Sequence, residues 1–200
     1  MSKLNKIILS KVIFGLAILF LLLFPFYRIG INFPTFLYNN ILIDARFFVA
    51  GFFFLIFCIL SLLYSLNVKS KKSNSKLVCF GKAVNAIFVD AILIYLSASG
   101  YISYLVPVVI VVYDLVIAII TNVLLFNGQS FELKTADTIK NAACLIGILL
   151  ILFYNLPFEL IGLKIADAFL YFASFMAIFA GFEFYFAYKK NLQLFVEVEK

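Results

Sequence analysis

Residues 47–66 read FFVAGFFFLIFCILSLLYSL, a run of 20 residues without a charged side chain. A helix of about 20 apolar residues crosses the roughly 30 Å hydrocarbon layer of a bilayer. That layer holds no water, so a spanning segment must satisfy its own backbone hydrogen bonds, as a helix does. The run therefore predicts a transmembrane helix.

Similar runs recur along the whole chain and leave no space for a separate soluble domain. Each is long and apolar enough to cross a bilayer as a helix. We therefore predict an all-α membrane protein with a single domain over residues 1–200. Its six spans are expected at about 12–30, 43–66, 81–99, 104–126, 141–156 and 165–188.

The first 11 residues place Lys3, Lys6 and Lys11 between apolar side chains. This pattern is typical of a short helix at the membrane surface, which we expect before the first span. A cleaved signal peptide would need small residues after the apolar run. Residues 22–27 read LLFPFY instead, so we expect the segment to be retained.

The composition excludes several classes of protein. The chain is 66% hydrophobic and 13% charged, with a mean hydropathy of +1.14, whereas soluble proteins are about 25% charged. It has no histidine, which excludes histidine-based triads and histidine zinc sites. Cys58, Cys79 and Cys144 share no metal-ligand spacing and are expected to be small buried residues.

The basic residues predict the orientation in the membrane. Six spans put both termini and the second and fourth connecting loops on one side, with 13 of the 16 lysines and arginines. Positive charge favours the cytoplasmic side, so both termini are expected in the cytoplasm and the protein in the cell membrane. The net charge of +6 thus indicates anionic membrane lipids as partners and not nucleic acid.

Few ionisable residues lie inside the predicted spans, and such residues are the default candidates for a site. Asp90 and Asp114 fit either a polar pocket or a hydrogen bond between helices, and both interpretations stay open. Glu183 fits an interfacial anchor better. Within a predicted span no two carboxylates stand three or four residues apart, and there is no glycine-rich phosphate loop, so no local motif binds Mg²⁺ or phosphate.

Five short motifs follow one another along residues 4–190: Asn5-Lys6-Ile7 with Lys11-Val12, Phe80-Gly81-Lys82, residues 107–114 (PVVIVVYD), Leu133-Lys134-Thr135 and residues 180–185 (AGFEFY). In this order they resemble the CDP-alcohol phosphatidyltransferase family, and within it the phosphatidylglycerophosphate synthase branch. The resemblance implies six spans after a surface helix and a homodimer. It also implies phospholipid biosynthesis from CDP-diacylglycerol and glycerol 3-phosphate with Mg²⁺ or Mn²⁺.

The chain departs from the family at the signature Asp-x2-Asp-Gly-x2-Ala-Arg-x8-Gly-x3-Asp-x3-Asp, whose aspartates bind the metals. With Gly81 as the anchor, the four aspartate positions fall on Tyr64, Asn67, Asn85 and Val89. The resemblance therefore implies a disabled active site with no metal. Asp90 is the one candidate to replace a lost carboxylate, although a shift of one residue turns a helical side chain by about 100°.

The resemblance also implies candidate substrate-binding residues, which are Asn67, Lys72, Gly81, Asn85, Asp114, Lys134 and Thr135. Three functions stay open. The first is a non-catalytic member that binds a nucleotide lipid, an anionic phospholipid or a catalytic homologue. The second is an active phosphatidyltransferase with a metal site rebuilt around Asp90. The third is a six-span substrate-binding subunit of a vitamin transporter.

Overall fold

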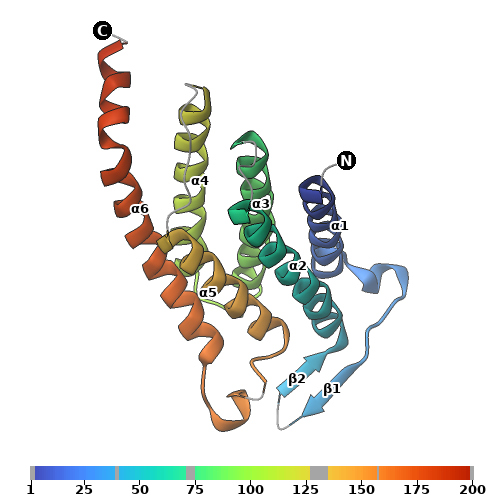
Figure 1. The fold of residues 1–200 in the computed structure, drawn as a ribbon. Helices are drawn as coiled ribbons and strands as arrows, with labels where there is room; N and C mark the ends of the chain where they lie inside the picture. Colours follow the sequence, from blue (N-terminus) through green and yellow to red (C-terminus); the bar gives the residue numbers. More distant parts are fainter. Residues whose placement is uncertain (1–2, 39–40, 71–74, 127–134, 157, 199–200) are drawn as a thin grey trace.

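The computed structural model describes residues 3–38, 41–70, 75–126, 135–156 and 158–198. These residues form six α-helices, two short 3-10 helices and one β-hairpin (Figure 1). The helices are α1 (Lys3–Leu23), α2 (Ala45–Ser70), α3 (Ser75–Ala98), α4 (Leu105–Phe126), α5 (Thr135–Leu152) and α6 (Ile165–Val198). The 3-10 helices are η1 (Phe26–Ile29) and η2 (Phe158–Ile161), and the strands are β1 (Thr35–Tyr38) and β2 (Ile41–Asp44).

All six α-helices contain a stretch that is long and apolar enough to cross a membrane. The prediction of a helical, multi-pass membrane protein is therefore confirmed. The start of α1 and the end of α6 lie at the same end of the bundle, in the upper part of Figure 1. We call this the terminal end.

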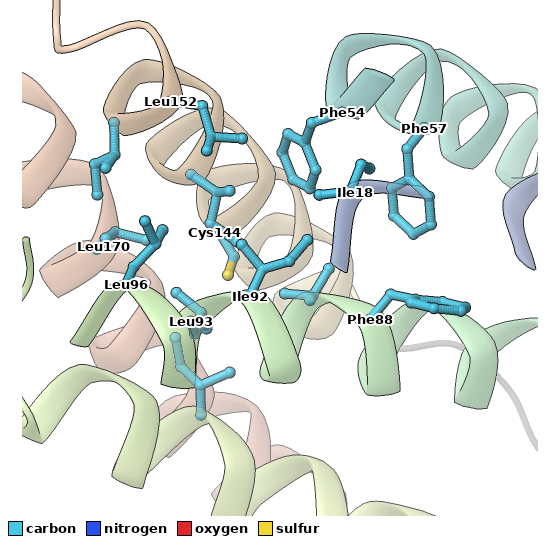
Figure 2. Packing of buried hydrophobic residues seen from close by; sticks show 14 of the residues in the cluster. Ile18, Phe54, Phe57, Phe88, Ile92, Leu93, Leu96, Cys144, Leu152 and Leu170 are labelled. Carbon is cyan, nitrogen blue, oxygen red and sulfur yellow. The ribbon is translucent and has the colours of Figure 1, made fainter. Parts of the chain in front are cut away.

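The helices pack in a closed ring. Each helix contacts its neighbours in the order α1, α3, α4, α6, α5 and α2, and α2 then returns to α1. Large buried side chains fill much of the ring (Figure 2), among them Ile18, Phe54, Phe57, Ile92 and Leu96, all with no exposed surface. Large apolar residues on the outward faces stay exposed, as expected for helices that face lipid.

The N-terminal segment differs from the prediction. Residues 3–23 form one continuous helix, so the structure has no separate surface helix over residues 3–11, and the first span begins near Lys3. No proline interrupts these residues, and the buried side chain of Lys11 joins the bundle. The predicted end at residue 30 is also too late, because Pro25 cannot continue the helix and residues 26–29 form η1.

The hairpin between α1 and α2 was not predicted. Its strands pair antiparallel, with Phe36 opposite Ile43. The backbone N–H of Asp44 at its end donates to the Tyr154 hydroxyl, which lies 2.7 Å away just beyond α5. Burial raises the pKa of Tyr154 to about 12, so the hydroxyl stays neutral near pH 7. This contact ties the hairpin to the end of α5.

Gly147 lets α5 and α6 pack closely. A Cβ atom there would lie 2.7 Å from Leu170 side-chain atoms and 3.3 Å from the Ala166 carbonyl oxygen. We therefore expect Gly147→Ala to lower the free energy of unfolding by about 1–3 kcal/mol, the usual cost of overpacking. Thermal unfolding in detergent checks this.

Gly181→Ala in α6 is the matched control for Gly147→Ala. A Cβ atom at Gly181 would meet nothing closer than the Tyr113 ring at 3.8 Å, which is an ordinary contact. This variant should therefore unfold at the wild-type temperature or slightly above it. An equal loss of stability in both variants would contradict the packing argument.

Candidate functional site

A partly open cavity of about 870 Å³ lies among helices α1 to α5. Its polar lining residues include Lys11 of α1, Tyr64 of α2, Lys82 and Asn85 of α3, Asp114 of α4 and Asp137 of α5. Most of these lie in the half of the bundle near the terminal end. Tyr64 is six residues before the end of α2, Lys82 is seven after the start of α3, and Asp137 is two after the start of α5.

Lys11 is a deeply buried cation of the cavity wall, with 1% of its surface exposed. Its Nζ donates to Asn85 Oδ1 at 2.9 Å, and Ser61 Oγ lies 2.9 Å from the same oxygen. The ammonium also lies 5.2 Å from the ring centroids of both Phe57 and Tyr64. Amide, hydroxyl and aromatic groups therefore surround the charge.

A cluster of ion pairs joins α3, α4 and α5, and three of its members line the cavity: Lys82, Asp114 and Asp137. Lys82 Nζ lies 2.7 Å from Asp137 Oδ2, and the Tyr113 hydroxyl donates to Asp137 Oδ1 at 3.2 Å. Lys140 is 1% exposed, donates to Asp114 and lies 3.8 Å from Asp137 Oδ1. Its Nζ is also 4.5 Å from the Tyr113 ring centroid. Both carboxylates of the wall are thus paired with lysines.

Two of the four positions that correspond to the family's aspartates line the cavity. These are Tyr64, whose hydroxyl donates to the Val78 carbonyl at 2.6 Å, and Asn85, which binds Lys11. Asn67 bonds to the Leu63 carbonyl of its own helix, and Val89 is buried in the apolar core. Neither of these two is among the described lining residues.

Of the other predicted substrate-binding residues, some line the cavity and some do not. Gly81 and Asp114 line the cavity, and the Tyr64 ring packs where a Cβ atom of residue 81 would lie. Thr135 is exposed at the start of α5 and is not among the described lining residues. Lys72 and Lys134 lie outside the described residues.

Asp90 lies on α3, close to the carboxyl group of Asp114 on α4, and is not among the described lining residues. Its Oδ1 is buried and has no hydrogen-bond partner within the described part of the chain. The structure therefore places Asp90 at the contact between α3 and α4, behind the ion-pair cluster.

Sequence reasoning missed Lys11, Asp137 and Lys140 as site residues. Lys11 counted toward the surface helix, the first family-like motif and the membrane orientation, and Lys140 counted only toward the orientation. The spacing of Asp137 and Lys140, three residues apart in one helix, was the available signal for an ion pair at the start of the fifth span.

The residues at the family's metal positions do not fit a divalent metal. Mg²⁺ bound to phosphates prefers anionic oxygen ligands. These positions offer a phenol, two amides and a valine, and Tyr64, Asn67 and Asn85 are bonded within the protein. Within the described ranges, no three or more Asp, Glu, Cys or His residues gather as they would around a metal ion.

Comparison with known proteins gives no match, since neither a protein-family model nor a curated protein corresponds to this chain.

Proposed function

We propose that this chain is a membrane protein of the phosphatidylglycerophosphate synthase type that has lost transferase activity and binds a lipid with a net negative charge, such as CDP-diacylglycerol or an anionic phospholipid. Both termini face the cytoplasm in this proposal, because 13 of the 16 lysines and arginines fall in the terminal segments and in the two connecting loops that six spans put on the same side. The homodimer implied by the resemblance belongs to the same proposal.

One observation carries the proposal. The cavity lies among the helices that hold the family-like motifs, yet the wall offers Tyr64 and Asn85 where the family has carboxylates. Both side chains are hydrogen-bonded within the protein, so neither is available as an anionic metal ligand. A site with this layout keeps space for a ligand but lacks the groups that would hold two metals.

An active enzyme with a rebuilt site is the second candidate. It is favoured by Asp114 and Asp137, which are carboxylates in the cavity wall. The ion pairs with Lys140 and Lys82 argue against it, because they neutralise both groups. Asp90 would have to leave the α3–α4 contact to reach the cavity.

The test is CMP release by the purified protein in lipid, with CDP-diacylglycerol, glycerol 3-phosphate and Mg²⁺ or Mn²⁺. A genuine synthase is the positive control. We expect no CMP above background, because the described residues at the positions matched to the metal ligands offer no carboxylate to hold the two metals that would activate the pyrophosphate of the CDP-lipid. Metal-dependent CMP release that Asp90→Ala abolishes would instead establish the rebuilt site.

Lipid retention tests the binding half of the proposal. Native mass spectrometry of the protein released from mixed nanodiscs should show phosphatidylglycerol bound in excess of phosphatidylcholine. Equal retention of the two lipids would contradict the proposed ligand. Copurification with an ATPase pair and a coupling subunit would favour a transporter subunit.

A further inference from the structure

The orientation of the Asn85 side chain is determined by Lys11. A lysine ammonium has donors and no acceptor, so the atom of Asn85 that faces it must be the carbonyl oxygen Oδ1. Ser61 Oγ lies near the same oxygen. The amide nitrogen Nδ2 therefore points away from Lys11.

The amide nitrogen reaches the open space of the cavity. Asn85 is one of the lining residues and is only half-buried. No described residue accepts a hydrogen bond from Nδ2, and this atom is not among the buried unpaired atoms. The wall thus presents an N–H donor at this point, where the resembling family presents a carboxylate oxygen.

Within the described part of the chain, no carboxylate contacts the Lys11 ammonium. Its contacts there are Asn85 and the rings of Phe57 and Tyr64. The carboxylates of the wall pair with Lys82 and Lys140 instead. A buried charge without a counter-charge is costly, and an anion in the cavity would offset that cost.

We infer that the cavity binds a phosphate anion directly and without a divalent metal, through the Asn85 amide backed by the Lys11 ammonium. The inference rests on the proposed function and specifies how the ligand is held. In the resembling family the position of Asn85 carries a carboxylate that binds a metal cation. In this chain the Asn85 amide at that position donates a hydrogen bond to an anion instead. In a low-dielectric cavity a fixed ammonium attracts phosphate oxygen strongly, and Lys11 strengthens the Asn85 donor through their shared hydrogen bond.

The test measures binding of two probes to the full chain in phosphatidylcholine nanodiscs, with EDTA or with Mg²⁺. The probes are phosphatidylglycerol, added to the nanodisc lipid, and free glycerol 3-phosphate. We expect binding in EDTA at the strength measured with Mg²⁺. Binding of the lipid alone would identify a headgroup as the ligand, and binding of glycerol 3-phosphate would identify a soluble phosphate ester.

Variants then test the two residues. Lys11→Met and Asn85→Asp are each expected to weaken binding about tenfold or more, the usual effect of losing a hydrogen bond to a charged group. Asn85→Asp replaces the N–H donor with a carboxylate that pairs with Lys11, so it should fold normally. Lys6→Met, at an exposed position on the same helix, is the matched control and should bind as the wild type does. Lys11→Arg keeps the charge and should retain most of the binding.

Three results would overturn the inference. Binding that requires Mg²⁺ and becomes tighter in Asn85→Asp would indicate a metal site. Metal-free binding that neither Lys11→Met nor Asn85→Asp weakens would remove these residues from the site and leave the proposed function standing. Failure of the wild type to bind either probe would overturn both the inference and the proposed ligand, whereas CMP release would overturn only the loss of catalysis.

Discussion

Replacing Lys140 with methionine should lower the free energy of unfolding by about 3–5 kcal/mol, the usual cost of removing one partner of a buried ion pair. Lys140 is 1% exposed, donates to Asp114 and lies 3.8 Å from Asp137. Its removal leaves Asp114 without its cation in the interior of the bundle, and Lys82 alone then faces both carboxylates. The loss is large because the bilayer and the packed helices give the remaining charge little access to water.

The double variant Lys140→Met/Asp114→Leu separates the ion pair from packing. The double variant removes the charges of both Lys140 and Asp114, so neither is left buried without its partner. Replacing a buried ion pair with hydrophobic residues often leaves the stability unchanged. The double variant should therefore be more stable than Lys140→Met alone. Equilibrium unfolding in mixed micelles measures all four members of the cycle. Additive losses from the two single variants would contradict a direct interaction.

Phe54→Ala should lower the free energy of unfolding by about 3–5 kcal/mol, the usual range for removing a phenylalanine ring from a packed interior. Phe54 has no exposed surface, and its ring stacks on Phe57 with the centroids 5.8 Å apart (Figure 2). Lipid cannot fill the resulting hole because the surrounding helices enclose it. The lost contacts are therefore not replaced.

Phe52→Ala is the matched control, since it removes the same atoms two residues earlier on α2. Phe52 is 61% exposed on the outward face, and its ring meets Phe153 edge-on at 5.5 Å. Removing the Phe52 ring should lower the free energy of unfolding by about 1 kcal/mol, which is the usual contribution of one aromatic contact. The same unfolding experiment compares the two variants. Equal losses would mean that the interior of the ring packs no better than its lipid-facing surface.

Much of the fold could be predicted because hydropathy is a local property. The run at residues 47–66 lies within α2, and each of the other predicted spans overlaps an observed helix. Two local features escaped the prediction. The strands of the hairpin are only four residues long, and the first helix continues through Lys3, Lys6 and Lys11 because nothing in the chain interrupts it.

The candidate site could be predicted only in part. The family-like motifs and their spacing singled out Gly81 and Asn85, and Asp114 stood out as an ionisable residue inside a predicted span; all three line one cavity in the structure. Spacing did not distinguish Asn67 from Asn85, although one bonds to its own helix and the other faces a buried lysine. That difference depends on which helices are neighbours in the ring.

The sequence by itself determined the class of membrane protein and the number of apolar segments long enough to span a bilayer. Each of these follows from residue type and from hydrogen bonding within a single helix. The tertiary structure alone decided that Lys11 meets Asn85, 74 residues away, and that Lys140 pairs with Asp114. Contacts of this kind depend on how separate helices pack, and a lysine beside an apolar run has the same local pattern whether it faces lipid headgroups or the interior of the bundle.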